Sequence, residues 1–286
     1  MFKKVIQRAS GRINRKDFIK LTKLCRKYDW LQDRSDALAE LWNYADKKNN
    51  KLLIEFLIKN FLFVNGRNYA NSCRLIANHI ENKWNLSPSN TIIASICINS
   101  SPDGSQRLIQ SLKNKFSTYW SEEGIFINCL PEAVKRIKSN SNIVLLDDFL
   151  GTGRTLNSRL DYLKYRINKE QILNVNIYFI ALAAMNFSKS FLDNLDVKYY
   201  SSFWLYKGIS ELLDEPKRAQ ALYDMGELEK KLAPKERRKT LPNLGYGQSE
   251  SLFAIDDDNI PTNVFPVFWW PRLADGHYRK TLFHRL

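Results

Sequence analysis

One short segment of the chain combines adjacent carboxylates with a glycine-rich turn. Residues 142–155 read N-I-V-L-L-D-D-F-L-G-T-G-R-T, so an apolar run leads into Asp147 and Asp148 and then into Gly151 and Gly153. Carboxylates at the end of a buried strand lie at the edge where open α/β sheets bind ligands. A glycine turn lets backbone amides approach a phosphate, and the N-terminus of the next helix favours its charge. The segment therefore predicts a site for a phosphorylated sugar, in which the carboxylates accept from sugar hydroxyls.

Three other interpretations of this segment compete with the sugar-phosphate site. A Walker B strand requires an upstream G-x-x-x-x-G-K-[ST] loop, and no Gly-Lys-Ser/Thr occurs in the chain. A Rossmann fingerprint requires a third glycine at residue 156, which is Leu156. An ordinary strand–turn–helix with surface aspartates stays open as the structural alternative, although two adjacent acids exceed what a turn needs.

Few residues could support other kinds of catalysis. No two cysteines lie within four residues of each other, which excludes a CxxC zinc or redox motif. The histidines are too few for a histidine-rich metal site, and none has the surroundings of a catalytic triad. The four cysteines are Cys25, Cys73, Cys97 and Cys129, and the three histidines are His79, His277 and His284. We therefore expect any catalysis to use carboxylates, backbone amides and a cation.

The elements around the segment predict an α/β fold. Residues 1–88 have helical spacing, with helices expected at 37–46, capped by Ser35 and Asp36, at 51–64 and at 69–84. Strands then alternate with helices, which implies a parallel sheet with right-handed crossovers, covered on both faces. The predicted strands are 91–99, 124–130, 142–147, 173–183 and 197–204, and the helices between them are 106–116, 132–138, 155–167 and 187–195.

Three regions are expected from this pattern. Residues 1–88 form a helical N-terminal region with a basic arm, and residues 89–210 form the sheet core. Residues 211–286 form a C-terminal extension that is irregular after Pro234 but rich in aromatic side chains. Because it is too apolar to remain exposed, we expect the extension to pack on the sheet core.

Positive charge is concentrated at the start of the chain. The 286 residues carry a formal net charge of +14, and residues 1–27 hold ten basic residues and one acid, or +9 of that total (10 − 1). Such blocks either solubilise the chain or bind a polyanion. The residues proposed for nucleic-acid or partner docking are Lys3, Lys4, Arg8, Arg12, Arg15 and Lys16.

Residues 143–156 resemble the phosphoribosyl-diphosphate binding motif of type I phosphoribosyltransferases: an apolar strand, two acids, a spacer, Thr-Gly and a closing Thr. Arg154 departs from it, since many biosynthetic members have glycine there. The helical N-terminal region and two C-terminal segments restrict the resemblance to a smaller family. These segments are G-Y-G-Q-S-E-S-L at 245–252 and P-T-N-V-F-P-V-F-W at 261–269. With them the chain resembles the divergent phosphoribosyltransferase-like family of bacterial conflict systems, which includes retron-linked antiphage effectors.

The resemblance assigns roles to individual residues. It implies a phosphoribosyltransferase-like α/β core in which Asp147 and Asp148 contact the ribose 2- and 3-hydroxyls. The 5-phosphate would lie in the turn, and the diphosphate at the loop after the first sheet strand, which could equally be an ordinary Pro-Asp-Gly turn. The implied phosphate-binding residues are Gly151, Thr152, Gly153, Arg154 and Thr155, and the pyrophosphate-loop residues are Ser101, Asp103, Gly104, Ser105 and Arg107. Mg²⁺ is expected on the substrate rather than on direct protein ligands.

These expectations combine into one functional hypothesis and two alternatives. The hypothesis is an antiphage effector, in a retron-type system, that binds phosphoribosyl diphosphate or a nucleotide and transfers or cleaves at ribose C1. The alternatives are a non-catalytic nucleotide sensor and a nucleic-acid-docked binding partner, and a reverse transcriptase with its DNA or RNA product is a possible partner in either role. The chain has no secretory apolar segment and no 18-residue uncharged apolar run, so we expect a bacterial cytoplasmic protein without a membrane partner.

Overall fold

The computed structural model describes residues 13–98, 104–120 and 125–285. Their contacts divide the chain into two compact units. We call residues 64–205 the sheet unit, and the described residues up to Phe63 together with those from Tyr206 onward the helical unit. Among the described residues, no helix is both long and apolar enough to cross a membrane.

The sheet unit is built on five parallel strands in the order β3-β2-β4-β5-β6. Their bounds are β2 Thr91–Ser95, β3 Phe126–Ile127, β4 Asn142–Leu150, β5 Asn176–Met185 and β6 Lys198–Leu205. Every residue of β2 is buried, as are the first six of β4, because helices cover both faces of the sheet. The predicted parallel α/β fold is confirmed.

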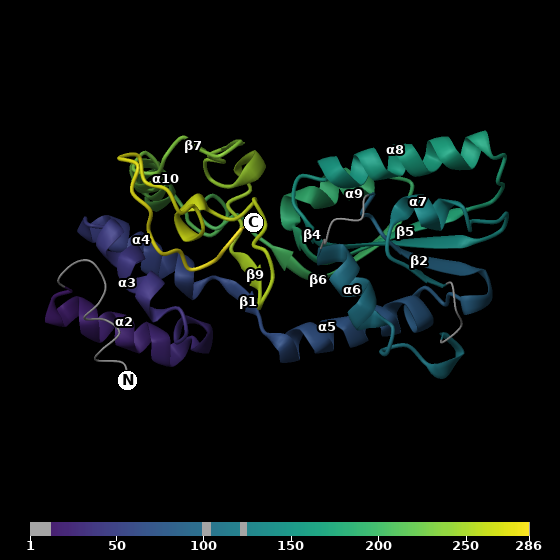
Figure 1. Ribbon diagram of the computed structural model, residues 1–286, viewed down its shortest axis with the longest axis horizontal. Helices are drawn as coiled ribbons and strands as arrows, with labels where there is room; N and C mark the ends of the chain where they lie inside the picture. Colours follow the sequence, from purple (N-terminus) through teal and green to yellow (C-terminus); the bar gives the residue numbers. More distant parts are fainter. Residues whose placement is uncertain (1–12, 99–103, 121–124, 286) are drawn as a thin grey trace. The chain divides into compact units, whose positions relative to one another are not determined.

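Helices cover the two faces in two groups (Figure 1). One face carries α7 (Leu130–Val134), α8 (Arg154–Lys169) and α9 (Lys189–Asp193), whose leucines share a core with Ile143, Leu145 and Phe179 of the sheet. The other face carries α5 (Gly66–Asn78) and α6 (Gly104–Leu112). After β2 the chain passes to β3 on one side and then returns to β4 on the other. The chain therefore reverses direction across the sheet between β2 and β4, which is where open α/β sheets place their ligands.

The helical unit brings the two ends of the chain into one hydrophobic core. Buried leucines and Trp42 of the N-terminal helices pack with Phe265, Phe268 and Trp270 of the C-terminal segment. Strand β1 pairs with β9, and Leu62 N–H donates to the Leu252 carbonyl at 2.9 Å. The elements are α2 Arg15–Lys27, α3 Ser35–Tyr44, α4 Lys48–Lys59, β1 Leu62–Val64, α10 Lys217–Glu229, β7 Lys235–Glu236, β8 Lys239–Thr240 and β9 Phe253–Ile255. Short 3₁₀ turns of the helical unit occupy Asp29–Leu31, Tyr246–Gln248 and Pro266–Phe268.

The sheet unit contains three further 3₁₀ turns, at Pro88–Asn90, Thr118–Trp120 and Asn186–Ser188, and a π-helical turn extends α5 over His79–Lys83.

The structure differs from the predicted organisation in three places. The C-terminal segment shares its core with the N-terminal helices, whereas the sequence predicted packing on the sheet. The predicted boundary at residue 88 falls elsewhere because α5 packs against α6 of the sheet unit. The predicted helix 51–64 ends at Lys59, since the following residues pair with β9, and the predicted caps Ser35 and Asp36 lie inside α3.

Two buried glutamates hold the irregular C-terminal segment in place. Glu229 at the end of α10 accepts from the Leu244 N–H with both carboxylate oxygens, at 3.0 and 3.1 Å. Glu250 accepts from the Ile209 and Ser210 N–H groups at 2.9 and 2.7 Å. Burial raises the pKa of Glu229 to about 7, with Glu250 nearby acting in the same direction and the Leu244 N–H opposing it.

The raised pKa of Glu229 predicts a pH-dependent stability. An unfolded glutamate releases its proton near pH 4.5, whereas the folded chain keeps it to about pH 7. The free energy of unfolding therefore falls as pH rises through this window, by about 3 kcal/mol, and stays level above it. Glu229→Gln should remove most of that fall, because an amide does not titrate in this pH range, while its oxygen can still accept from the Leu244 N–H.

Urea denaturation at pH 5 and pH 8 measures this effect. Glu227→Gln is the matched control, since Glu227 lies on the same helix and pairs with Lys230 at 2.7 Å near the surface. The control should keep the wild-type pH dependence. An equal pH dependence in Glu229→Gln and wild type would contradict the assignment.

Candidate functional site

The candidate site lies at the carboxyl edge of the sheet, between β2 and β4. Pairing of β4 with β2 ends at Leu146, opposite Ser95, whereas pairing with β5 continues to Leu150. The last four residues of β4 therefore extend past the end of β2 on that side. The sequence predicted a strand that ends at Asp147, with Asp148 just after it; the structure places both aspartates inside β4, in this overhang.

The two aspartates leave the strand on opposite faces. Successive side chains of a strand alternate, so Asp147 shares a face with Leu145 and the α8 layer, and Asp148 faces the α6 layer. Asp147 is 9% exposed, and one of its oxygens accepts from the Asp148 N–H at 3.0 Å. Asp148 is half-buried. A ligand in the overhang can thus meet one carboxylate on each side of the sheet edge.

Asp148 lies directly against the first residue of α6. A Cβ at Gly104 would overlap the Asp148 carboxyl group, so glycine is required for this approach. The positive end of the α6 dipole favours the negative charge of the carboxylate there. The start of α6 is itself fixed, because the fully buried Ser105 lies 2.5 Å from the Ser95 hydroxyl at the end of β2. The Ser105 side chain thus holds the start of the helix, and its role in the pyrophosphate loop stays a prediction.

The glycine turn leads directly into α8. Gly153 is the N-cap of α8, with φ +78°, and the Asn157 N–H donates to its carbonyl at 2.9 Å. A Cβ at Gly153 would overlap the Phe191 ring, so this position needs glycine both for its conformation and for space. No side chain caps the helix, and the first N–H groups of a helix have no partner within it. Arg154 and Thr155 are exposed at this end, and Thr152 is half-buried.

Arg107 and Tyr69 extend the site along α6. The Arg107 guanidinium lies over the Tyr69 ring, with 5.0 Å between Cζ and the ring centroid. Burial raises the pKa of Tyr69; the hydrogen bond with Ser111 and the charge of Arg107 oppose the shift, while the charge of Asp148 adds to it. Tyr69 was missed by sequence reasoning, because nothing in its spacing on α5 indicates that α6 will lie beside it.

The remaining predicted residues are divided between the two units and the undescribed segments. Ser101, Asp103, Lys3, Lys4, Arg8 and Arg12 lie outside the described residues. Arg15 and Lys16 are exposed on α2 of the helical unit. The 245–252 and 261–269 runs are tied to each other by backbone hydrogen bonds, including Tyr246 to Thr262 at 2.8 Å and Ser251 to Asn263 at 3.0 Å.

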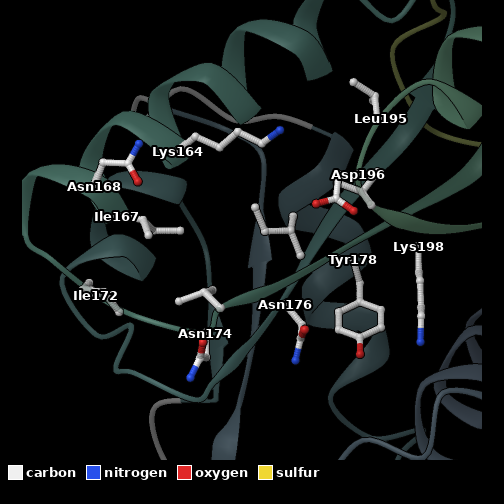
Figure 2. Close-up of a pocket in the computed structure, with 13 residues that line it drawn as sticks. Lys164, Ile167, Asn168, Ile172, Asn174, Asn176, Tyr178, Leu195, Asp196 and Lys198 are labelled. Carbon is white, nitrogen blue, oxygen red and sulfur yellow. The ribbon is translucent and has the colours of Figure 1, made fainter.

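A second hollow, of about 540 Å³, opens at the other edge of the sheet (Figure 2). It is lined by Asn176 and Lys198, the first residues of β5 and β6, and by Lys164 of α8. The amides of Asn174 and Asn176 donate to Asn140 and Asn142 at 2.9 and 3.0 Å. Because these amides link neighbouring segments and the hollow lies at the amino ends of the strands, it is not the candidate site.

Comparison with known proteins gives the family. A family model described as PRTase-CE matches residues 30–285. The chain belongs to the PRTase-CE family. It is therefore a phosphoribosyltransferase-like protein, and the match spans both units. No curated protein matches the sequence.

The PRTase-CE chain is also similar to solved phosphoribosyltransferase structures. Hypoxanthine-guanine phosphoribosyltransferase from Schistosoma mansoni, in complex with IMP, is 13% identical over 50% of this chain and 68% of that one, with a TM-score of 0.34. The hypoxanthine phosphoribosyltransferase from Staphylococcus aureus is 14% identical, over 48% and 72%, with a TM-score of 0.29. The enzyme from Leishmania tarentolae, in complex with GMP, is 15% identical, over 49% and 75%, with a TM-score of 0.30.

The tight turn at Gly153 of this PRTase-CE protein predicts that a larger residue there will lower the free energy of unfolding. Gly153→Ala should lower the free energy of unfolding by about 2 kcal/mol, because alanine disfavours φ +78° and its methyl group meets the Phe191 ring. Adding Phe191→Leu should recover part of the loss, since it relieves the overlap but not the backbone strain. Urea denaturation of the single and double variants measures both parts.

Gly226→Ala is the control for this glycine series. Gly226 lies in α10 with no atom near its missing Cβ, so alanine should leave stability unchanged or raise it by up to about 1 kcal/mol. A Gly153→Ala protein as stable as wild type would show that the turn does not adopt the tight conformation described.

Proposed function

We propose that the carboxyl edge of the sheet binds a phosphorylated ribose, as phosphoribosyl diphosphate or a nucleotide, and that the protein transfers or cleaves at ribose C1. The main support is that Asp147 and Asp148, in the β4 overhang, lie at the same edge of the sheet as the tight turn that begins α8. Carboxylates accept hydrogen bonds from vicinal hydroxyls, while uncapped helix amides bind phosphate. A ribose phosphate carries both groups.

The binding roles follow from where each group lies. Asp147 and Asp148 would hold the ribose hydroxyls, one from each side of the sheet edge. The N–H groups of the turn, with the Thr152 and Thr155 hydroxyls and Arg154, would hold the 5-phosphate. A diphosphate on C1 would lie toward the start of α6, where the helix N-terminus and Arg107 supply positive charge.

The chemistry at C1 requires stabilisation of a positive charge. Breaking the bond from C1 to its leaving group, a diphosphate or a base, gives the ribose oxocarbenium character. A carboxylate of Asp147 or Asp148, fixed by the strand, stabilises that charge, and the phosphate turn fixes the ribose relative to it. The leaving group takes the bonding electrons, and an acceptor base, side chain or water then forms the new bond at C1.

Mg²⁺ fits this site as an ion carried by the substrate. The described residues hold no group of three or more His, Cys, Asp or Glu side chains that could bind a metal ion. Two carboxylates beside a diphosphate suit an ion that takes most of its ligands from phosphate oxygens and water. When bound, Mg²⁺ would neutralise charge on the departing diphosphate.

We further propose that the protein is an effector of bacterial antiphage defence of the retron type, acting in the cytoplasm. The support is the sequence resemblance of the 143–156, 245–252 and 261–269 segments to such effectors. A reverse transcriptase with its DNA or RNA product would be the partner that restrains it. The exposed Arg15 and Lys16 on α2 offer positive charge to such a polyanion.

Removing both carboxylates tests the reaction and the defence role together. Asp147→Asn with Asp148→Asn should lower turnover by about a hundredfold or more and abolish toxicity or phage protection, because the charge that stabilises the oxocarbenium ion is gone. Metabolite profiling and plaque assays of cells that express each form measure the two effects. Asp161→Asn with Asp196→Asn, two exposed carboxylates of the same unit, is the control. Full protection in the double variant would contradict the effector mechanism.

Binding is tested separately at the start of α6. Gly104→Ala should weaken binding of phosphoribosyl diphosphate by about tenfold or more, because its methyl group displaces the Asp148 carboxylate. Isothermal titration calorimetry measures the affinity. Gly66→Ala, at the first residue of α5 with open space around it, should bind as wild type does. Tight binding without release of diphosphate or base would favour the sensor alternative, and equal affinity in Gly104→Ala and wild type would contradict the site.

A further inference from the structure

A groove crosses the surface of the helical unit, in a part of the chain that the proposed reaction does not use. It is lined mainly by α2 and α4, with Trp42 of α3 and the neighbouring Asp46, and has a volume of about 720 Å³. We call it the α2–α4 groove. α2 and α4 contain 13 and 12 residues, so the groove is about 20 Å long at the helical rise of 1.5 Å per residue.

Trp42 lies beneath the groove. Its side chain is fully buried, and the ammonium groups of Lys20 and Lys51 lie 5.4 and 5.9 Å from its ring centroid. Lys51 pairs with Asp17 at 2.8 Å, and Lys20 pairs with Glu55, which also pairs with Lys59 at 2.7 Å. The Lys51–Asp17 and Lys20–Glu55 pairs connect α2 to α4 and make the groove a packed feature of the fold.

The rim of the groove carries an uncompensated positive charge. Seven lysines line it against three acidic residues, Asp17, Asp46 and Glu55. Each of the three acids already pairs with a lysine, Asp46 with Lys231 at 2.6 Å. Residues 1–12, which precede α2 in the sequence, contain four basic residues and no acid, so they supply no negative charge to the groove. The occupant that complements this groove must therefore be acidic.

The groove also offers apolar contacts. Ile19 on α2 is 45% exposed and Leu52 on α4 is 48% exposed, and both line the groove. A single exposed aliphatic side chain is ordinary, but two on facing helices within one basic groove provide a place for apolar anchors. Among the described residues that line the groove, Trp42 is the one aromatic, and its buried ring offers no face for a nucleic-acid base to stack on.

We propose that the α2–α4 groove binds an acidic amphipathic helix of a partner protein. Apolar side chains at i, i+3 or i+4, and i+7 of that helix would contact Ile19 and Leu52, and its acidic side chains would pair with rim lysines such as Lys16, Lys23 and Lys48. Nucleic acid would use the charge but leave the aliphatic side chains uncovered. A second copy of this chain, at a net charge of +14, would meet like charge.

A displayed library of 16-residue peptides, selected on the full-length protein, tests the proposal. We expect enrichment of helical sequences with apolar residues at that spacing and Asp or Glu between them. Ile19→Ser with Leu52→Ser should weaken binding of an enriched peptide about tenfold or more, as removal of interface anchors does. Lys16→Gln with Lys23→Gln and Lys48→Gln should weaken binding and reduce its salt dependence.

Matched variants in the sheet unit and rival probes complete the test. Leu75→Ser with Leu173→Ser removes two comparably exposed leucines, and circular dichroism confirms that every variant is folded. These controls should bind the peptide as wild type does. The proposal is overturned if no acidic pattern is enriched, or if the groove variants bind the peptide normally. It is also overturned if Ile19→Ser with Leu52→Ser instead impairs binding of a 20-nucleotide single strand, or abolishes a dimer seen by sedimentation.

Discussion

The close approach of the Asp148 carboxylate to Gly104 organises the carboxyl edge of the sheet. It places a negative side chain from the centre of the sheet at the positive end of α6, where a Cβ would not fit. The buried contact between Ser95 and Ser105 fixes the same helix to the end of β2. The strand that carries the carboxylates and the helix that begins beside them are thus held by two contacts only a few residues apart.

The sheet topology explains why these contacts occur at this edge. Since the chain leaves β2 for β3 on one side and reaches β4 on the other, α6 and α8 begin on opposite faces of the same crevice. Asp148 contacts the first residue of α6, and the turn at Gly153 leads into α8. Both helix N-termini favour negative charge, and the carboxylates between them suit hydroxyls. The proposed ribose phosphate would use both features, whereas a simple anion would use only the helix N-termini.

The helical unit is stabilised in a different way. Its core joins the two ends of the chain, and the irregular C-terminal segment is held by the buried carboxylates of Glu229 and Glu250, which accept from backbone N–H groups. The aromatic side chains of Phe265, Phe268, Trp269 and Trp270 are buried in this core and are not available for base stacking. On the other side of this core, α2 and α4 present lysines around exposed aliphatic side chains. The unit thus combines a packed interior with a surface suited to an acidic partner.

The sequence by itself determined the local features of this protein. The apolar run before Asp147 predicted β4, the alternation of strands and helices predicted a parallel sheet, and Gly151 to Thr155 predicted a turn into a helix. These features depend on residue types within one element and its neighbours, so periodicity and turn chemistry suffice to find them. Element bounds were less exact, as β4 runs on to Leu150 because β5 pairs with it that far.

Only the tertiary structure decided which distant residues meet. The proximity of Gly104 and Tyr69 to Asp148, the burial of Ser105 and the opposite faces of the two aspartates depend on how α5 and α6 cover the sheet. The division into units likewise depends on pairing between β1 and β9 and on a core shared by both ends of the chain. Such contacts join residues far apart in sequence, and the hydrophobic pattern of each element shows only that a face is buried, not which partner buries it.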